Sequence, residues 1–148
     1  MRLPQKFIVC PLCATKVPPM ETPMEYDLCM QRLNEMHESS TGYVKRHQEG
    51  DLSNPKIKTA MNYSDRIFQA IQTLSRLNDG ISGGEKVLKQ AAWFEKQGCK
   101  ARESAEKRGK RYDEGFFDDV MKARMRKSCW YFRFSILIET MAKSVDKR

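Results

Sequence analysis

The sequence predicts an all-α protein: a three- to four-helix bundle that follows a short N-terminal arm containing proline and cysteine. After residue 24, apolar residues recur at intervals of three and four, the period of helices with one buried face. No run of alternating β-branched residues indicates a strand. Five of the six prolines lie at or before Pro23, so no long helix can run through the first segment. We therefore expect an arm over residues 1–23 and a helical domain over residues 24–148.

Within the helical domain we expect four helices, at about residues 24–47, 55–78, 84–109 and 116–143. The second has the clearest pattern, because apolar residues from Ile57 to Leu77 form two adjacent rows on one broad face. Asp79 and Gly80 end this helix. Ser82 and Glu85 then have the spacing of a capping box, in which the serine side chain accepts hydrogen bonds from the first amides of the next helix.

The bulk properties limit the class of protein. A chain of 148 residues is the size of one domain with a small appendage. No secretory signal is visible, and the longest apolar stretch, Trp130 to Ile138, is interrupted by Arg133 and is much shorter than the ~20 residues that span a bilayer. Five cysteines is an odd number, and a helical chain of this size has little need of disulfides. We expect a protein without membrane contact, in the cytoplasm or in an organelle matrix.

The cysteines nearest the N-terminus resemble half of a zinc ribbon. Cys10 and Cys13 are separated by two residues, and two thiolates at that spacing can bind one tetrahedral zinc ion. The alternative is a pair of reduced cysteines in a turn. The nearest further candidate ligands are Cys29 and His37, but on one continuous helix they lie ~12 Å apart, too far to share an ion. A break in the helix near Ser39, or a ligand brought in by the fold, would be needed to complete the site.

Charge divides the chain into two segments. Residues 1–54 carry six Lys/Arg and seven Asp/Glu, a net charge of −1, whereas residues 55–148 carry 21 and 12, a net charge of +9. A cationic surplus confined to one segment is typical of a surface that binds a polyanion such as a phosphate backbone. The candidate nucleic-acid-binding residues are Lys96, Lys100, Arg102, Lys107, Arg108, Lys110, Arg111, Lys122, Arg124, Arg126, Lys127 and Arg133.

Aromatic residues follow the second cationic cluster directly. Trp130 or Tyr131 would favour single strands if its ring stacked on unpaired bases. The alternative for Trp130, Phe132 and Phe134 is an ordinary place in the core, and for the cations a solvated helix face. No motif that reads base sequence is present, so binding through the phosphate backbone is the expectation.

The sequence gives little support for catalysis. Gly80 to Lys86 resembles the signature loop of ABC-type and SMC-type ATPases, but the chain has no G-x-x-x-x-G-K-[ST] phosphate loop, so we expect no nucleotide cofactor. Asp118 and Asp119 form an acidic pair where a helix is predicted to begin, a position at which carboxylates stabilise the helix dipole. With two histidines and no evident nucleophile and base, we expect a protein that is not an enzyme.

These observations predict a small basic accessory subunit of a nucleoprotein complex, acting in replication, recombination, packaging or an RNA-guided machine. Its N-terminal arm would contact at least one protein partner. The alternative is an adaptor, an inhibitor or a structural subunit that docks through the methionine-rich first helix, because methionine suits adaptable apolar contacts. Self-association is a third possibility. The methionines of that interface would be Met20, Met24, Met30 and Met36.

Overall fold

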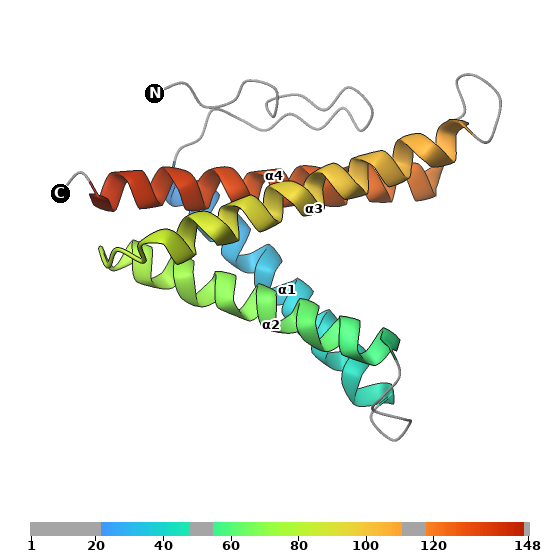
Figure 1. Cartoon of the computed structure of the whole chain (residues 1–148), viewed down its shortest axis with the longest axis horizontal. Helices are drawn as coiled ribbons and strands as arrows, with labels where there is room; N and C mark the ends of the chain where they lie inside the picture. Colours follow the sequence, from blue (N-terminus) through green and yellow to red (C-terminus); the bar gives the residue numbers. More distant parts are fainter. Residues whose placement is uncertain (1–21, 48–54, 111–117, 147–148) are drawn as a thin grey trace.

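The computed structural model describes residues 22–47, 55–110 and 118–146, with side chains described from residue 25. These ranges contain helices and no strand, which confirms the predicted all-α class for this part of the chain. The arm, apart from its last two residues, lies outside the described residues. The helices are α1 (Thr22–His47), α2 (Pro55–Asn78), α3 (Glu85–Lys110) and α4 (Asp119–Asp146), as shown in Figure 1.

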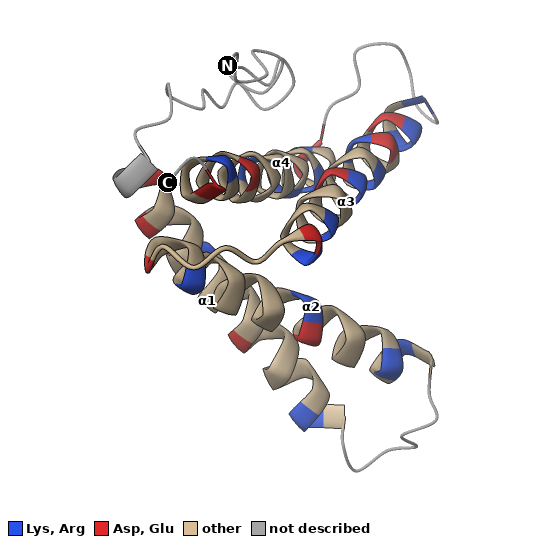
Figure 2. Ribbon diagram, turned by 60° about the vertical axis from the view of Figure 1, so that its left-hand side comes forward, with Lys and Arg blue, Asp and Glu red and all other residues tan. Residues whose placement is uncertain are grey.

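The helices form two antiparallel hairpins, α1–α2 and α3–α4. In Figures 1 and 2 the hairpins lie against each other at one end and diverge toward the other, so that the ends carrying residues 47 and 55 and residues 110 and 119 stand apart. Helix α4 contacts all three other helices.

The core is centred on the middle of α4. Residues 131–138 are buried at eight consecutive positions, which a helix achieves only when neighbours cover it on every side. Phe94 of α3 packs edge-on against Phe134, and Leu33, Ile67 and Leu137 are fully buried around them. The expectation that Phe132 and Phe134 belong to the core is confirmed.

Helices α3 and α4 approach closely because small residues line their contact. Ala91, Gly98 and Ala105 recur every seventh residue of α3 and are all buried. The hydroxyl of Ser128 donates to the carbonyl of Gly98 at 2.7 Å, and that of Ser135 donates to the carbonyl of Ala91 at 2.7 Å. These two bonds satisfy buried hydroxyls and fix the register of α4 on α3.

A buried ion pair joins the two hairpins. Arg133 of α4 donates to both carboxylate oxygens of Glu25 in α1, at 2.7 and 2.9 Å, and the side chains are only 9% and 4% exposed. Although burial would lower the pKa of Arg133, the hydrogen bonds and the negative charge of Glu25 outweigh it and raise that pKa. The prediction that Arg133 binds phosphate is wrong, because its guanidinium is buried and already paired.

The turn between the hairpins differs from the predicted capping box. The hydroxyl of Ser82 donates to Asp146 near the end of α4, at 2.9 Å, rather than capping α3. Gly80 and Gly84 have φ values of 82° and 64°, a left-handed conformation that glycine adopts at little cost. Gly84 thus turns the chain immediately before α3. The hydrogen bond from Ser82 to Asp146 joins this turn to the end of α4.

No helix in the described ranges contains an apolar stretch long enough to cross a bilayer.

Candidate nucleic-acid interface

Four lysines of α3 share one exposed face, which we call the α3 strip: Lys96, Lys100, Lys107 and Lys110. Their spacings of four, seven and three residues place them within an arc of ~80° at ~100° per residue. In the described part of the chain, no ion pair is present at Lys96, Lys100 or Lys107. Figure 2 shows cationic residues interspersed with acidic ones along α3. The strip is therefore a row of charges that a polyanion can reach.

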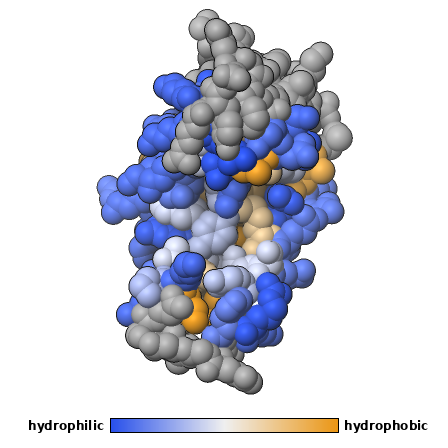
Figure 3. All heavy atoms as spheres, turned by 90° about the vertical axis from the view of Figure 1, so that its right-hand side faces the viewer, coloured by the Kyte–Doolittle hydropathy of each residue, from blue (hydrophilic) through white to orange (hydrophobic). Residues whose placement is uncertain are grey.

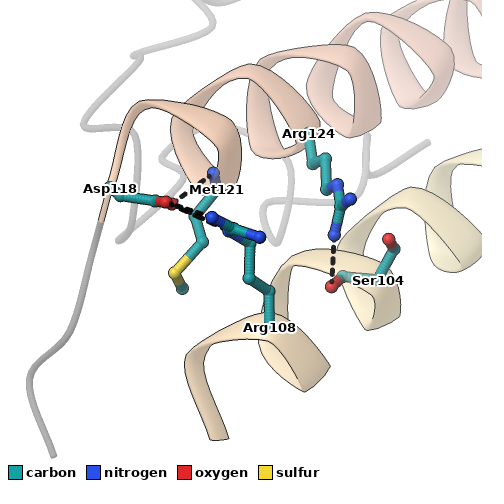
Figure 4. Close-up of polar contacts among 5 residues, drawn as sticks. All are labelled: Ser104, Arg108, Asp118, Met121 and Arg124. Atoms are coloured by element: carbon teal, nitrogen blue, oxygen red, sulfur yellow. Dashed lines mark hydrogen bonds and ion pairs between the residues drawn. The ribbon is translucent and has the colours of Figure 1, made fainter. Parts of the chain in front are cut away.

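Arg124 of α4 extends this surface from the neighbouring helix. Its guanidinium donates to the backbone carbonyl of Ser104 at 3.3 Å, which places it over α3 (Figure 4). Lys100, Lys107, Glu103 and Arg124 line an open depression of about 470 Å³. Glu103 is the acidic member of this lining, so the depression has a positive balance.

Besides Arg133, two further arginines of the predicted set are paired within the chain. Arg108 makes a bidentate contact with Asp118, with its closest nitrogen 2.7 Å from the carboxylate (Figure 4). Arg102 pairs with Glu106 at 3.2 Å on the exposed side of α3. Their charges are largely neutralised, which leaves the lysines of the α3 strip and Arg124 as the stronger phosphate donors.

Asp118 connects the end of α3 to the start of α4. Besides pairing with Arg108, its carboxylate accepts the backbone N–H of Met121 at 3.0 Å, as an N-cap does. The interpretation of the acidic pair as a stabiliser of a helix start is thus confirmed for Asp118. The hydrogen bonds from Arg108 and from the Met121 amide lower the pKa of Asp118 below its ordinary value of 3.8.

Because this pKa is lower in the folded state, ionised Asp118 stabilises the fold above pH 3.8 and the contribution is lost as the pH falls further. We expect Asp118→Asn, which keeps a capping side chain but no charge, to have a lower thermal midpoint than the natural chain at neutral pH. The difference between the two midpoints should shrink toward zero below the ordinary pKa. Thermal unfolding by circular dichroism across pH measures it, and a difference independent of pH would contradict this role.

Among the remaining cations of α4, Lys122 and Arg126 lie on the side of the helix away from Arg124. Arg126 follows Arg124 by two residues and therefore points ~200° away from it, while Lys122 lies on nearly the same face as Arg126. The structure does not gather the predicted cations on one surface. The clusters seen along the chain divide between the α3 strip with Arg124 and a second surface that includes Lys122, Arg126 and Lys127; Arg111 lies outside the described residues.

That second surface borders a groove between the hairpins. Two adjoining depressions of about 460 and 510 Å³ share Ser39, Ser40, Tyr63 and Lys127 as lining residues, and together we call them the inter-hairpin groove. Figure 3 looks toward the side where the hairpins diverge and shows side chains of intermediate hydropathy between hydrophilic flanks.

Sequence reasoning missed the residues that α1 and α2 contribute to this groove. Arg32, Tyr43 and Tyr63 line it, but none of them lies near the cationic clusters of the last two helices in the sequence. Trp130, proposed either to stack on bases or to lie in the core, is half-buried and lines the groove. Tyr131, its alternative for stacking, is buried and shares a 2.7 Å hydrogen bond with the hydroxyl of Tyr63.

The two predicted metal ligands on α1 are not brought together. Cys10 and Cys13 lie outside the described residues, so zinc binding by this pair stays a prediction. Helix α1 runs unbroken past Ser39, which leaves Cys29 and His37 eight residues apart on it. His37 instead packs against Phe68, with ring centroids 5.5 Å apart. No cluster of three or more candidate ligands occurs among residues 22–47, 55–110 and 118–146.

Cys29 is part of the hydrophobic core. It is fully buried, and its thiol lies 3.6 Å from a carboxylate oxygen of Glu25. Burial, followed by the charge of Glu25, raises the pKa of the Cys29 thiol and so opposes the thiolate that zinc requires. The assignment of Cys29 and His37 as ligands of one ion is wrong in this fold.

Comparison with models of known protein families, with curated proteins and with solved structures gives no match to this chain.

Proposed function

We propose that this chain is a non-enzymatic nucleic-acid-binding protein, an accessory subunit of a nucleoprotein complex, and that the α3 strip and Arg124 contact the phosphate backbone. The observation that supports this most directly is the set of exposed lysines on one face of α3. In the described residues, Lys96, Lys100 and Lys107 have no carboxylate partner, whereas nearby Arg102 and Arg108 do.

The dimensions of the strip suit a polyanion. Lys96 and Lys107 are eleven residues apart, a rise of ~16 Å along α3. Over that length a DNA duplex carries roughly ten phosphate charges, at one per ~1.7 Å. Arg124 adds a planar donor beside the strip, held in place by its bond to Ser104. Several cations can thus contact one backbone at the same time.

The proposal predicts binding that depends strongly on salt. If the four lysines of the α3 strip and Arg124 replace counterions, the slope of log K against log salt should be about −4 to −5 on duplex DNA and about −3 to −4 on a single strand. A gel-shift or filter-binding series in rising salt measures it. Undetectable binding at low salt, or affinity that ignores salt, would remove the proposal.

A charge-reversal pair locates the contact. We expect Lys100→Glu with Lys107→Glu to weaken binding at least about tenfold and to make the slope shallower by about 2. The matched control is Arg76→Glu with Lys86→Glu, which changes the net charge equally but lies beside the α2–α3 turn, at the other end of α3. If both pairs weaken binding to the same extent, net charge rather than the α3 strip is responsible.

The adaptor alternative depends on four methionines, of which the structure describes the side chains of two. Met30 and Met36 are half-buried and pack against the core, and the side chains of Met20 and Met24 lie outside the described residues. Recovery of the same protein partners from cells before and after nuclease treatment, together with undetectable nucleic-acid binding, would favour the adaptor over the proposal.

A further inference from the structure

The inter-hairpin groove combines rings with positive charge. Tyr43, Tyr63 and Trp130 line it, and so do Arg32, Arg126 and Lys127. Its acidic lining residue is Glu35, which is already paired with Arg32 at 3.2 Å. A ligand that fits this lining carries negative charge together with flat, partly apolar groups.

The rings are held in place by cations and by neighbouring rings. The guanidinium of Arg133 lies 4.2 Å from the ring centre of Trp130, and the ammonium of Lys127 lies 5.7 Å from that of Tyr63. Tyr43 stacks on His47 with ring centroids 4.2 Å apart. Such fixed rings lose little conformational freedom when a planar group packs against them.

We propose that the inter-hairpin groove binds a single strand of nucleic acid, with unpaired bases packed against Tyr43 and its neighbouring rings and phosphates paired with Arg126 and Lys127. This inference rests on the proposed function and assigns it a second, strand-selective surface. Each depression has a volume in the range of small-molecule sites, which is large enough for a nucleotide. Aromatic stacking with a basic backbone contact is the usual chemistry of single-strand binding.

The two surfaces then have different preferences. The α3 strip is a convex row of charges on one helix and contacts the backbone of either a duplex or a single strand. The groove is concave and bounded by both hairpins, so it discriminates in favour of unpaired bases. Sequence selectivity is not expected, because every base offers a flat face to the rings.

The test compares a twenty-nucleotide oligo(dT) with a duplex of equal length at one salt concentration. We expect Tyr43→Ala to weaken oligo(dT) binding roughly 5- to 100-fold and duplex binding less than about twofold. Tyr43→Phe keeps the ring and should keep the oligo(dT) affinity, which separates stacking from a loss of folding. The Lys100→Glu/Lys107→Glu pair should weaken binding of both probes.

The outcomes separate this inference from the proposed function. If the natural chain binds both probes but Tyr43→Ala changes neither affinity, the groove proposal is overturned and the α3 strip proposal stands. If the natural chain binds neither probe, both fail. Poly-L-glutamate is the competing probe: if it displaces oligo(dT) with equal potency and its own binding falls in Tyr43→Ala, the groove accepts an acidic protein segment and the nucleic-acid assignment is wrong.

Fluorescence of Trp130 gives an independent readout. In a Trp93→Phe background, Trp130 is the remaining tryptophan, and oligo(dT) should quench its emission while the duplex should not. Equal quenching by the two probes would contradict strand selection by the groove.

Discussion

Replacing Glu25 with alanine should lower the free energy of unfolding by about 3–5 kcal/mol. The substitution leaves the guanidinium of Arg133, 8% exposed, in the interior without its bidentate partner. An isolated buried charge retains little of its hydration, so the fold loses both the attraction and the hydrogen bonds. Urea denaturation followed by far-ultraviolet circular dichroism measures the change.

The control is an exposed pair of similar chemistry. Glu106→Ala removes the carboxylate that pairs with Arg102 at 3.2 Å, where both side chains are about half exposed. We expect that change to cost no more than about 0.5 kcal/mol, because solvent screens the pair. Comparable losses for Glu25→Ala and Glu106→Ala would mean that the Glu25 pair is hydrated rather than buried.

A double replacement separates the net contribution of the ion pair to stability from the cost of leaving one partner unpaired. Changing Glu25 and Arg133 together to methionine removes both charges and keeps an apolar volume between the hairpins. We expect this variant to be more stable than Glu25→Ala alone, since a buried pair replaced by apolar groups is often neutral. A double variant as unstable as the single one would show that the hydrogen bonds themselves hold α1 on α4.

The helices could be predicted closely from the sequence, because local signals determine where they begin and end. The structure has α2 at Pro55–Asn78, the predicted range, and places α3 one residue and α4 three residues later than expected. The apolar rows, the fixed φ of Pro55 and the glycine after Asp79 are all properties of neighbouring residues. The capping box failed because a tertiary partner, Asp146, takes the hydroxyl of Ser82.

The candidate site could be predicted only in part. Proximity along the chain suggested one cationic surface, but Arg124 and Arg126 are ~200° apart on a helix and face different neighbours. Arg133 is buried because it pairs with Glu25, which is 108 residues away in the sequence. No local sequence pattern predicts such a pair. The groove likewise requires Tyr43 and Tyr63 from α1 and α2, which lie outside the two cationic clusters, so only the packing of the hairpins reveals it.

Gly98→Val should lower the free energy of unfolding by about 1–3 kcal/mol, although valine has the higher intrinsic helix propensity. A Cβ at this position would lie 2.9 Å from Cε1 of Phe132 and 3.0 Å from two more atoms of the same ring. That ring is 9% exposed and packed in the core, so it has no free space into which to move. The clash between the valine side chain and the Phe132 ring can be relieved only if α3 and α4 move apart. Urea denaturation measures the loss.

Gly42 of α1 provides the matched control. A Cβ there meets only the end of the flexible Arg46 side chain, at 3.5 Å, so Gly42→Ala should be neutral or stabilise by up to about 1 kcal/mol. Adding Phe132→Leu to Gly98→Val should recover part of the lost stability, because the smaller side chain makes room between the helices. A stable Gly98→Val chain would mean that the close approach of α3 and α4 is not required for stability.

Because separation of the helices would also pull Arg124 away from Ser104, the Gly98→Val variant should bind duplex DNA more weakly even where it remains folded.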